Sequence, residues 1–161
     1  LVPTITIMIP LYIILDKVHL LGTYVGPILA HVSVNAPFVA WLVLGFIRDI
    51  PGDLFEAGKL DGCTRMQVFW KIVFPLLSPA IGSALLLVMQ YSWNELLFSM
   101  QYTNLHTYTL TVGVSRFVGA ISVDWGQSSA AATIVMVPII IAGFFLQKYL
   151  VSGLTAGAIK G

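Results

Sequence analysis

The charged side chains that could do chemistry gather in one segment of the sequence, residues 48–71. Its acidic and basic groups nearly cancel, so the segment lacks the basic face that a nucleic-acid partner requires. Such a mixture suits the capping of helix ends and docking against another protein surface. The six charges that offset one another are Asp53, Glu56, Asp61, Lys59, Arg65 and Lys71.

The other reactive side chains are too scattered to form a recognisable catalytic or metal site. Cys63 is the single cysteine, which excludes an internal disulfide and a multi-thiolate metal site. The histidines lack metal-ligand spacing, and no Gly-x-x-x-x-Gly-Lys-Ser/Thr phosphate loop occurs. We therefore expect no catalytic residue, no metal and no cofactor, and we expect any nucleotide to be bound by another subunit. The histidines are His19, His31 and His106.

Residues 53–70 are predicted to fold as two short helices joined by a tight turn. Asp53 has capping-box spacing to the glutamate three residues later, with aspartate in place of the usual Ser or Thr. Gly62 supplies the stop because glycine enters the left-handed conformation without steric cost. Thr64 then repeats the capping-box spacing with the glutamine three residues on. A loop of about 24 residues exceeds what a connection between two membrane spans needs, which favours a docking element.

The composition predicts that the elements positioning this loop cross a lipid bilayer. Hydrophobic residues make up 58% of the chain and charged residues only 9%, whereas soluble domains carry about a quarter charged residues. Neutral runs long enough to span hydrocarbon, which takes about 20 residues, separate the charges. We predict an all-α, polytopic transmembrane helical bundle forming a single domain over residues 1–161. Its four spans are predicted at about 1–15, 27–47, 72–94 and 125–147.

The placement of Lys and Arg predicts the orientation of these spans, because basic residues in short loops stay on the cytoplasmic side. The 48–71 loop and the C-terminal end together hold six basic residues, and the opposite side holds two, Lys17 and Arg116. We therefore predict that the loop and the C-terminus are cytoplasmic. Residues 95–124 then form an external loop.

The 48–71 loop also carries a spaced pattern that runs Glu56-Ala57-Gly58, then Gly62, then Ile72 and Phe74-Pro75. This pattern resembles the cytoplasmic EAA loop of ABC importer permeases. Gly58 departs from it by standing for the third alanine, and Phe74 by standing for a leucine. Glycine lowers helix stability by up to about 1 kcal/mol relative to alanine.

Other segments extend the resemblance over nearly the whole chain, and they are closest to the MalG-like carbohydrate permeases. The tail is long and specific, so loop and tail together make the resemblance strong. The segments are Ile9–Tyr12, Tyr91–Glu95, Asp124–Gly126, Ala130–Ala132 and Gln147–Gly161.

The resemblance implies a type I ABC importer permease fold in a bacterial or archaeal plasma (inner) membrane. Such permeases have six spans, so the four here match the last four and two are expected to be missing. The implied partners are a second permease, two ABC ATPase subunits, an extracytoplasmic solute-binding protein and a carbohydrate substrate. Pro75 and Pro79 are predicted hinges of the transport motion. The residues implied to couple the loop to the ATPase are Glu56, Ala57, Gly58, Asp61 and Gly62.

Polar residues in two predicted spans are candidates for the substrate path. Gln90 and Asn94 share one helix face near the outer end of the third span, where an inter-helix hydrogen bond is the alternative. Tyr91 offers a flat face that suits a sugar ring. Asn35, in the second span, fits either packing or substrate contact.

Residues at the outer boundary have structural explanations beside functional ones. Trp93 is explained by the aromatic belt at membrane interfaces, and Glu95 either caps the span or contacts the partner permease. The resemblance implies that the external loop docks the solute-binding protein, with a solvated surface as the alternative. The loop residues in question are Gln101, Tyr102, Asn104 and Arg116.

Two other classes of membrane protein fit the sequence less well. An ion-coupled secondary transporter would place carboxylates within its spans, yet Asp, Glu, Lys and Arg are all absent from the predicted span interiors. An intramembrane enzyme would need a paired nucleophile or a metal-ligand set at membrane depth, and the sequence shows neither.

Overall fold

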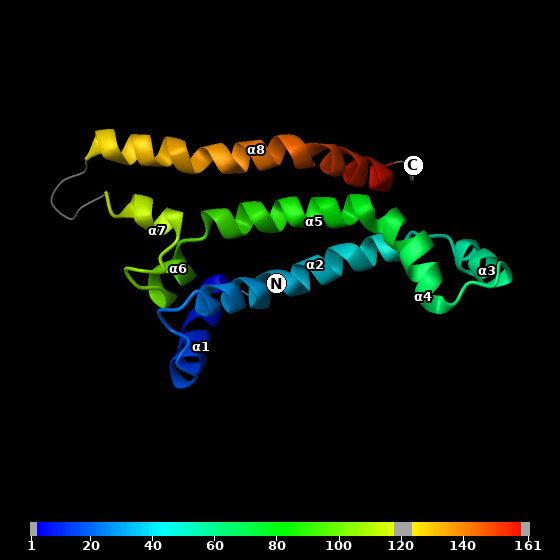
Figure 1. The fold of residues 1–161 in the computed structure, drawn as a ribbon, viewed down its shortest axis with the longest axis horizontal. Coiled ribbons are helices and arrows are strands. Elements are labelled where there is room, and N and C mark those ends of the chain that lie inside the picture. Colours follow the sequence, from blue (N-terminus) through cyan, green and yellow to red (C-terminus); the bar gives the residue numbers. More distant parts are fainter. Residues whose placement is uncertain (1–2, 118–123, 159–161) are drawn as a thin grey trace. The chain divides into compact units, whose positions relative to one another are not determined.

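A computed structural model of the chain describes residues 3–117 and 124–158, with side chains up to Phe145 and at Gln147. Every regular element in these residues is helical (Figure 1), which confirms the all-α prediction. Residues 118–123 of the predicted external loop and 159–161 of the tail lie outside the described residues.

The chain divides into two compact units. The first comprises residues 1–37 and 89–142, and the second residues 38–88 and 143–161. Three long helices contribute residues to both units: α2 (Val25–Arg48), α5 (Phe74–Asn94) and α8 (Trp125–Ala158).

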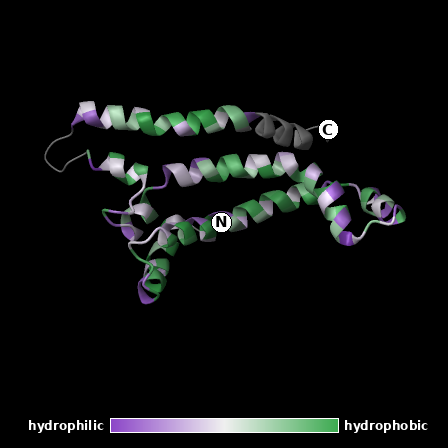
Figure 2. Cartoon of the chain, in the orientation of Figure 1, coloured by the Kyte–Doolittle hydropathy of each residue, from purple (hydrophilic) through white to green (hydrophobic). Residues whose placement is uncertain are grey.

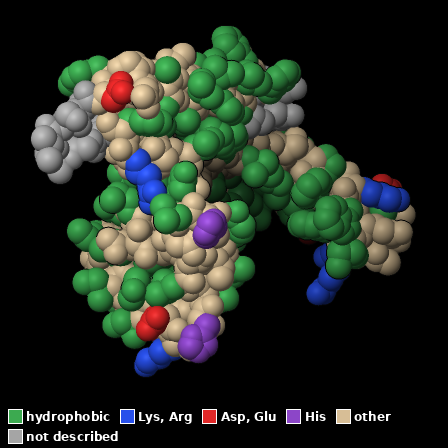
Figure 3. Space-filling view, turned by 60° about the vertical axis from the view of Figure 1, so that its left-hand side comes forward, with side chains coloured by type: hydrophobic (Ala, Val, Ile, Leu, Met, Phe, Trp, Pro, Cys, Tyr) green, Lys and Arg blue, Asp and Glu red, His purple; other side chains and the backbone are tan. Residues whose placement is uncertain are grey.

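Three helical stretches within the described residues are long and apolar enough to cross a membrane. They are Val25–Arg48, Arg65–Asn94 and Trp125–Phe145, and Figure 2 shows hydrophobic residues predominating along them. Hydrophobic side chains also predominate on the face drawn in Figure 3, where charged side chains are few. Helix α1 (Thr4–Lys17) has 14 residues and rises only about 21 Å, so the first predicted span stays a prediction.

The core of the first unit lies where α1 and the short helix α6 (Leu97–Tyr102) pack together. Tyr102 is fully buried, and its hydroxyl donates a 2.6 Å hydrogen bond to the carbonyl of Met8, since a buried tyrosine hydroxyl needs a partner. The buried core residues are Leu15, Ala30, Phe98 and Tyr102, with Met8, Leu11, Leu20, Leu21 and Val34 packed around them.

Two connections of the first unit are joined by hydrogen bonds at Gly22. Its backbone adopts φ +73°, its N–H donates to the Tyr102 carbonyl at 2.8 Å, and its own carbonyl accepts from Asn104 Nδ2 at 3.0 Å and Thr107 Oγ1 at 3.1 Å. The turn between α1 and α2 is thereby fixed to the loop between α6 and α7 (Leu110–Ser115).

The second unit contains the 48–71 segment and the helix that follows it. Helix α3 (Asp53–Leu60) is followed by a turn and then by α4 (Arg65–Val68). From α4 the chain continues without interruption through a π-helical turn, η1 (Phe69–Val73), into α5. Figure 1 shows the chain bending where α4 leads into α5. Sharp bends arise at prolines and π-helical turns, and here Pro75 is the second residue after η1. The core residues are Val68, Val73 and Leu77, surrounded by Val43, Phe46, Ile47, Ile50, Phe55, Cys63, Ile72 and Ile81.

Gly22→Ala is expected to destabilise the first unit. A Cβ there would lie 2.7 Å from Asn104 Nδ2, and the left-handed backbone alone costs a non-glycine residue about 1–2 kcal/mol. The melting temperature of the detergent-solubilised protein should fall. Gly45→Ala is the matched control, because a Cβ at Gly45 meets nothing within 4 Å and alanine favours a helix interior. Equal melting temperatures for both variants would contradict this account.

Candidate functional site

Helix α3 begins differently from the sequence prediction. Gly52 occupies the N-cap position and Asp53 is the first helical residue, so the predicted capping role of Asp53 is wrong. The N–H groups of Leu54 and Phe55 donate to the carbonyls of Pro51 and Gly52, at 3.2 and 2.9 Å. Because this turn supplies backbone acceptors, the first turn needs no side-chain cap. The acidic residues of that turn still favour the helix through its dipole.

The end of α3 is as predicted. Gly62 adopts φ +78°, its N–H donates to the carbonyl of Lys59, and the N–H of Cys63 donates to the carbonyl of Gly58, both at 3.0 Å. These two bonds form the Schellman motif that ends many helices at a left-handed glycine. The turn between the two short helices therefore has a defined geometry.

The capping box predicted for the second short helix is confirmed. The Thr64 N–H donates to Gln67 Oε1 at 2.8 Å, and the Gln67 N–H donates to Thr64 Oγ1 at 3.3 Å. Both ends of the turn are thus satisfied within the segment itself. We call α3, this turn and α4 the hairpin.

Gly58 fixes how closely the two arms of the hairpin approach each other. It is buried, and a Cβ at this position would lie 3.0 Å from both Val68 Cγ2 and Ile72 Cδ1. The sequence suggested that glycine here weakens α3. The structure adds that the missing methyl group allows α3 to pack against the base of the helix leading into α5.

The outward side of α3 presents the residues that the resemblance associates with coupling. Glu56, Ala57 and Asp61 are exposed, and Leu60 beside them is 89% exposed. The inward side carries Phe55 and the buried Gly58. The hairpin therefore offers a small surface of mixed charge and apolar character, held by a packed inner side.

The candidate path residues on α5 are exposed. Asn94 Nδ2 donates to the carbonyl of Gln90 at 2.8 Å within the same helix, so one amide donor is satisfied within α5. The Tyr91 hydroxyl is hydrogen-bonded to Thr4 Oγ1 at 2.8 Å. Gln90, Tyr91 and Asn94 thus form a polar face at one end of α5.

Asn35 differs from these residues because it is buried, with 8% of its surface exposed. Its amide donates to the carbonyl of His31, one turn earlier in α2, at 2.8 Å. Its own helix therefore satisfies this donor.

The indole N–H of Trp93 is hydrogen-bonded within the protein. That group donates to the carbonyl of Val135 in α8 at 3.1 Å, and the Trp93 carbonyl accepts from Thr111 Oγ1 at 3.0 Å. These two bonds could not be predicted together with the aromatic belt, because they join Trp93 to segments distant in the sequence.

Glu95 caps the helix that follows it. It is 8% exposed, and its carboxylate accepts from the N–H groups of Phe98 at 2.8 Å and Ser99 at 3.2 Å. A carboxylate at a helix start satisfies free N–H groups and complements the dipole. These hydrogen bonds account for the burial of Glu95, for which the sequence offered capping of the span or contact with the partner permease.

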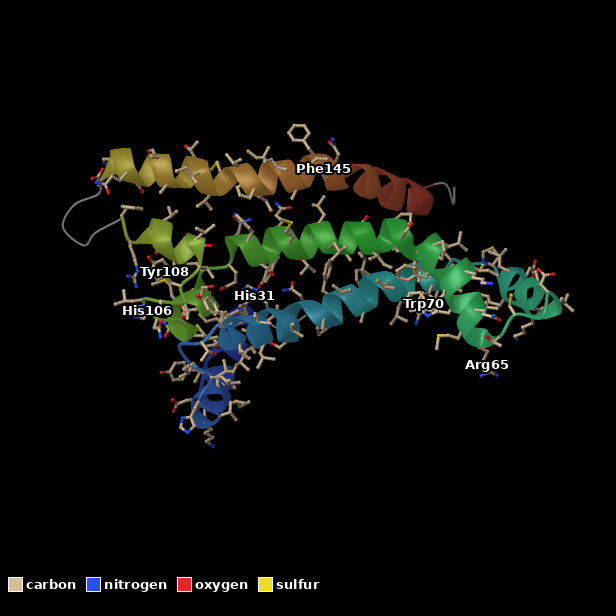
Figure 4. The ribbon with its side chains drawn as sticks, in the orientation of Figure 1. His31, Arg65, Trp70, His106, Tyr108 and Phe145 are labelled. Atoms are coloured by element: carbon tan, nitrogen blue, oxygen red, sulfur yellow. The ribbon has the colours of Figure 1, made fainter. Side chains whose placement is uncertain are left out.

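The external-loop residues divide into buried and exposed groups. Tyr102 is fully buried, so the expectation of a surface position for it is wrong. Burial, with a contribution from Glu95, raises the pKa of Tyr102 to about 12, and its hydroxyl stays a proton donor at neutral pH. Gln101 is exposed, and the Arg116 guanidinium lies 4.7 Å from the centre of the Tyr108 ring, a residue labelled in Figure 4.

The amino-acid sequence matches a known protein family. The model of the family "binding-protein-dependent transport system inner membrane component" matches residues 1–156. The chain belongs to this family. It is therefore a multi-pass membrane protein, and its helices agree with that assignment.

Individual relatives of this permease family match almost the full chain. It is 36% identical to a probable ABC transporter permease, y4oR, of Sinorhizobium fredii, over 99% of this chain and 57% of that protein. It is 35% identical to the trehalose/maltose permease MalG of Thermococcus litoralis, over 99% and 58%. It is 34% identical to the sulfoquinovosyl glycerol permease SmoH of Agrobacterium fabrum, over 99% and 56%. The chain thus spans somewhat more than half the length of these relatives.

Gly58→Ala is expected to loosen the hairpin even though alanine is the better helix former. Overpacking against Val68 costs about 1–3 kcal/mol, which exceeds the gain in helix propensity of about 1 kcal/mol. Faster tryptic cleavage after Lys59 and Arg65 would report the change. In a background that combines Val68→Ala with Ile72→Val both close contacts are removed, and the same substitution should slow cleavage. If Gly58→Ala changed the rate of tryptic cleavage in the same direction in both backgrounds, the close-packing explanation would be refuted.

Proposed function

We propose that this chain is the membrane-spanning permease part of an ATP-driven ABC importer that moves a carbohydrate delivered by an extracytoplasmic solute-binding protein. The family match over residues 1–156 carries this proposal. The sugar class is supported by relatives named for trehalose/maltose and sulfoquinovosyl glycerol transport.

In this proposal the hairpin couples the permease to its ATPase. Glu56, Ala57, Gly58, Asp61 and Gly62 form or shape the surface that enters a groove of the ATPase. Support comes from the exposed outward side of α3 and from its packed inner side. Both ends of the turn are hydrogen-bonded, so the hairpin is suited to move as one piece with a docked subunit.

The proposed partners follow from this role. The chain pairs with a second permease subunit, two ABC ATPase subunits hydrolyse ATP, and a solute-binding protein docks outside. The chain itself contributes transport, not catalysis, and its relatives are likewise named as permeases.

The proposed topology keeps the 48–71 loop, with the hairpin, and the C-terminus in the cytoplasm and residues 95–124 outside. The spans are those predicted at about 1–15, 27–47, 72–94 and 125–147. The unequal distribution of Lys and Arg supports this orientation.

The proposed substrate path runs along Gln90, Tyr91 and Asn94. Their exposure supports it, because polar groups on a span are favourable when they face a water-filled cavity. We assign Asn35 a packing role, since it is buried and its amide is satisfied within α2. The ion-coupled alternative gains no support from the comparisons.

Glu56→Lys is expected to abolish coupling, because it places a positive charge where the ATPase is proposed to present a basic residue. Transport and binding-protein-stimulated ATP hydrolysis by the reconstituted transporter should both be lost, with normal membrane insertion. Asp16→Lys makes the same charge change at an exposed residue outside the hairpin and should leave both activities intact. Full stimulated hydrolysis in the Glu56→Lys protein would count against the coupling role.

Gln90→Leu is expected to reduce sugar uptake while leaving stimulated ATP hydrolysis in place, because it removes a polar group from the path and leaves the hairpin untouched. Uptake of labelled sugar into proteoliposomes, measured beside hydrolysis, separates the two effects. Leu85→Ala, at an exposed apolar residue of the same helix, serves as the control. Normal uptake by Gln90→Leu at limiting sugar would remove this residue from the path.

A further inference from the structure

Three aromatic residues form an exposed cluster where the hairpin meets α5. The ring centres of Phe69 and Trp70 lie 5.1 Å apart, those of Trp70 and Phe74 5.0 Å, and those of Phe69 and Phe74 6.3 Å. Their exposed fractions are 39%, 55% and 40%. We call these three residues the aromatic cluster. Figure 4 labels Trp70, a residue of η1.

The aromatic cluster does not belong to the packed side of its helix. Val68, Val73 and Leu77 supply that side and form the buried core of the second unit. The rings instead contact one another in edge-to-face and tilted arrangements, and the fold of this unit leaves their outer surfaces exposed.

The length of the helix places the cluster at a definite depth. The continuous helical stretch from Arg65 to Asn94 has 30 residues, whereas the hydrocarbon core takes up about 20 residues. Counting about 20 residues back from Asn94 ends near Pro75. Phe69 and Trp70 therefore fall within two turns outside the hydrocarbon, at the level of the lipid headgroups, and Phe74 lies at its boundary.

Basic residues lie close to the cluster in the sequence. Lys71 lies within η1 and Arg65 begins α4, and both are exposed; Figure 4 labels Arg65. Tryptophan and basic residues together are the composition that membrane interfaces favour, with the rings among the headgroups and the cations near anionic lipid.

We propose that the aromatic cluster, with Lys71 and Arg65, seats the base of the hairpin in the headgroup layer of an anionic lipid leaflet. This inference rests on the proposed membrane topology. It gives the hairpin a fixed depth: α5 can tilt or rotate during transport, while the rings hold the junction at the bilayer surface.

Spin labels attached to single cysteines test this depth in the assembled transporter, reconstituted in phosphatidylcholine vesicles containing phosphatidylglycerol. Cys63→Ser removes the native thiol, and the partner subunits are made cysteine-free. Labels replace Trp70, Trp41, Ile134 or Leu60, and their accessibility to oxygen, which partitions into lipid, is compared with that to a water-soluble nickel reagent. Trp41 and Ile134 are exposed span residues, and Leu60 is exposed on the hairpin.

The label at 70 is expected to lie between the span labels, which oxygen reaches best, and the Leu60 label, which nickel reaches best. A label at 70 that neither reagent reaches, or one as accessible to nickel as that at Leu60, would overturn the lipid seat while the span labels uphold the topology. Nickel access at both Trp41 and Ile134 would instead overturn the proposed topology, and the inference with it.

A second measurement keeps the native rings and labels Leu76, an exposed residue of α5 just past the cluster. Combining Phe69→Ala with Trp70→Ala should increase nickel access at this label, because the junction loses its seat. Leu85→Ala combined with Leu87→Ala, two exposed apolar residues of the same helix, is the matched control and should leave it unchanged. Equal nickel access for both double variants would contradict the seat.

Discussion

Hydrocarbon offers no hydrogen-bond partner, so each backbone N–H and C=O group inside a bilayer must be paired within the protein. Each long helix of this chain contains a proline, which has no backbone N–H and therefore leaves the carbonyl four residues earlier without its usual helical donor. Side chains bond to other carbonyls close to two of these sites: the Ser83 hydroxyl donates to the carbonyl of Pro79, and the Trp93 indole donates to that of Val135, in the turn before Pro138. The prolines inside α2, α5 and α8 are Pro37, Pro79 and Pro138.

The same requirement holds where the helices end. Glu95 satisfies the first N–H groups of α6, Thr64 and Gln67 those of α4, and Gly62 allows the last carbonyls of α3 to be paired. The hairpin is thus complete in itself, with free helix ends satisfied by residues close in sequence. An element built in this way can project from a membrane and keep its shape.

Features set by neighbouring residues could be read from the sequence. The capping box at Thr64 and the stop at Gly62 depend on spacings of a few residues, and the apolar helices follow from the spacing of charges. The error at Asp53 was also local: the turn at Pro51 and Gly52 supplied backbone acceptors that a side-chain pattern does not reveal.

Features set by distant residues could not be read in the same way. The burial of Tyr102 depends on α1, the bond from Trp93 depends on α8, and the tight contact at Gly58 depends on Val68 and Ile72. Gly58 did leave a signal, since glycine departs from the alanine of the motif that it otherwise resembles. The physical reason for that departure, a missing methyl group at a helix contact, required the structure.

The π-helical turn η1 also sets the direction in which the hairpin faces. A π-helical turn holds one more residue than an α-helical turn, and one residue corresponds to about 100° of rotation around a helix axis. The direction in which Glu56 faces around the axis of α5 therefore depends on the number of residues between Val68 and Phe74. Deleting a single residue there would leave the caps of α3 and α4 in place, yet would shift Ile72 and Val73 relative to α3 and aim its outward side at a different neighbour.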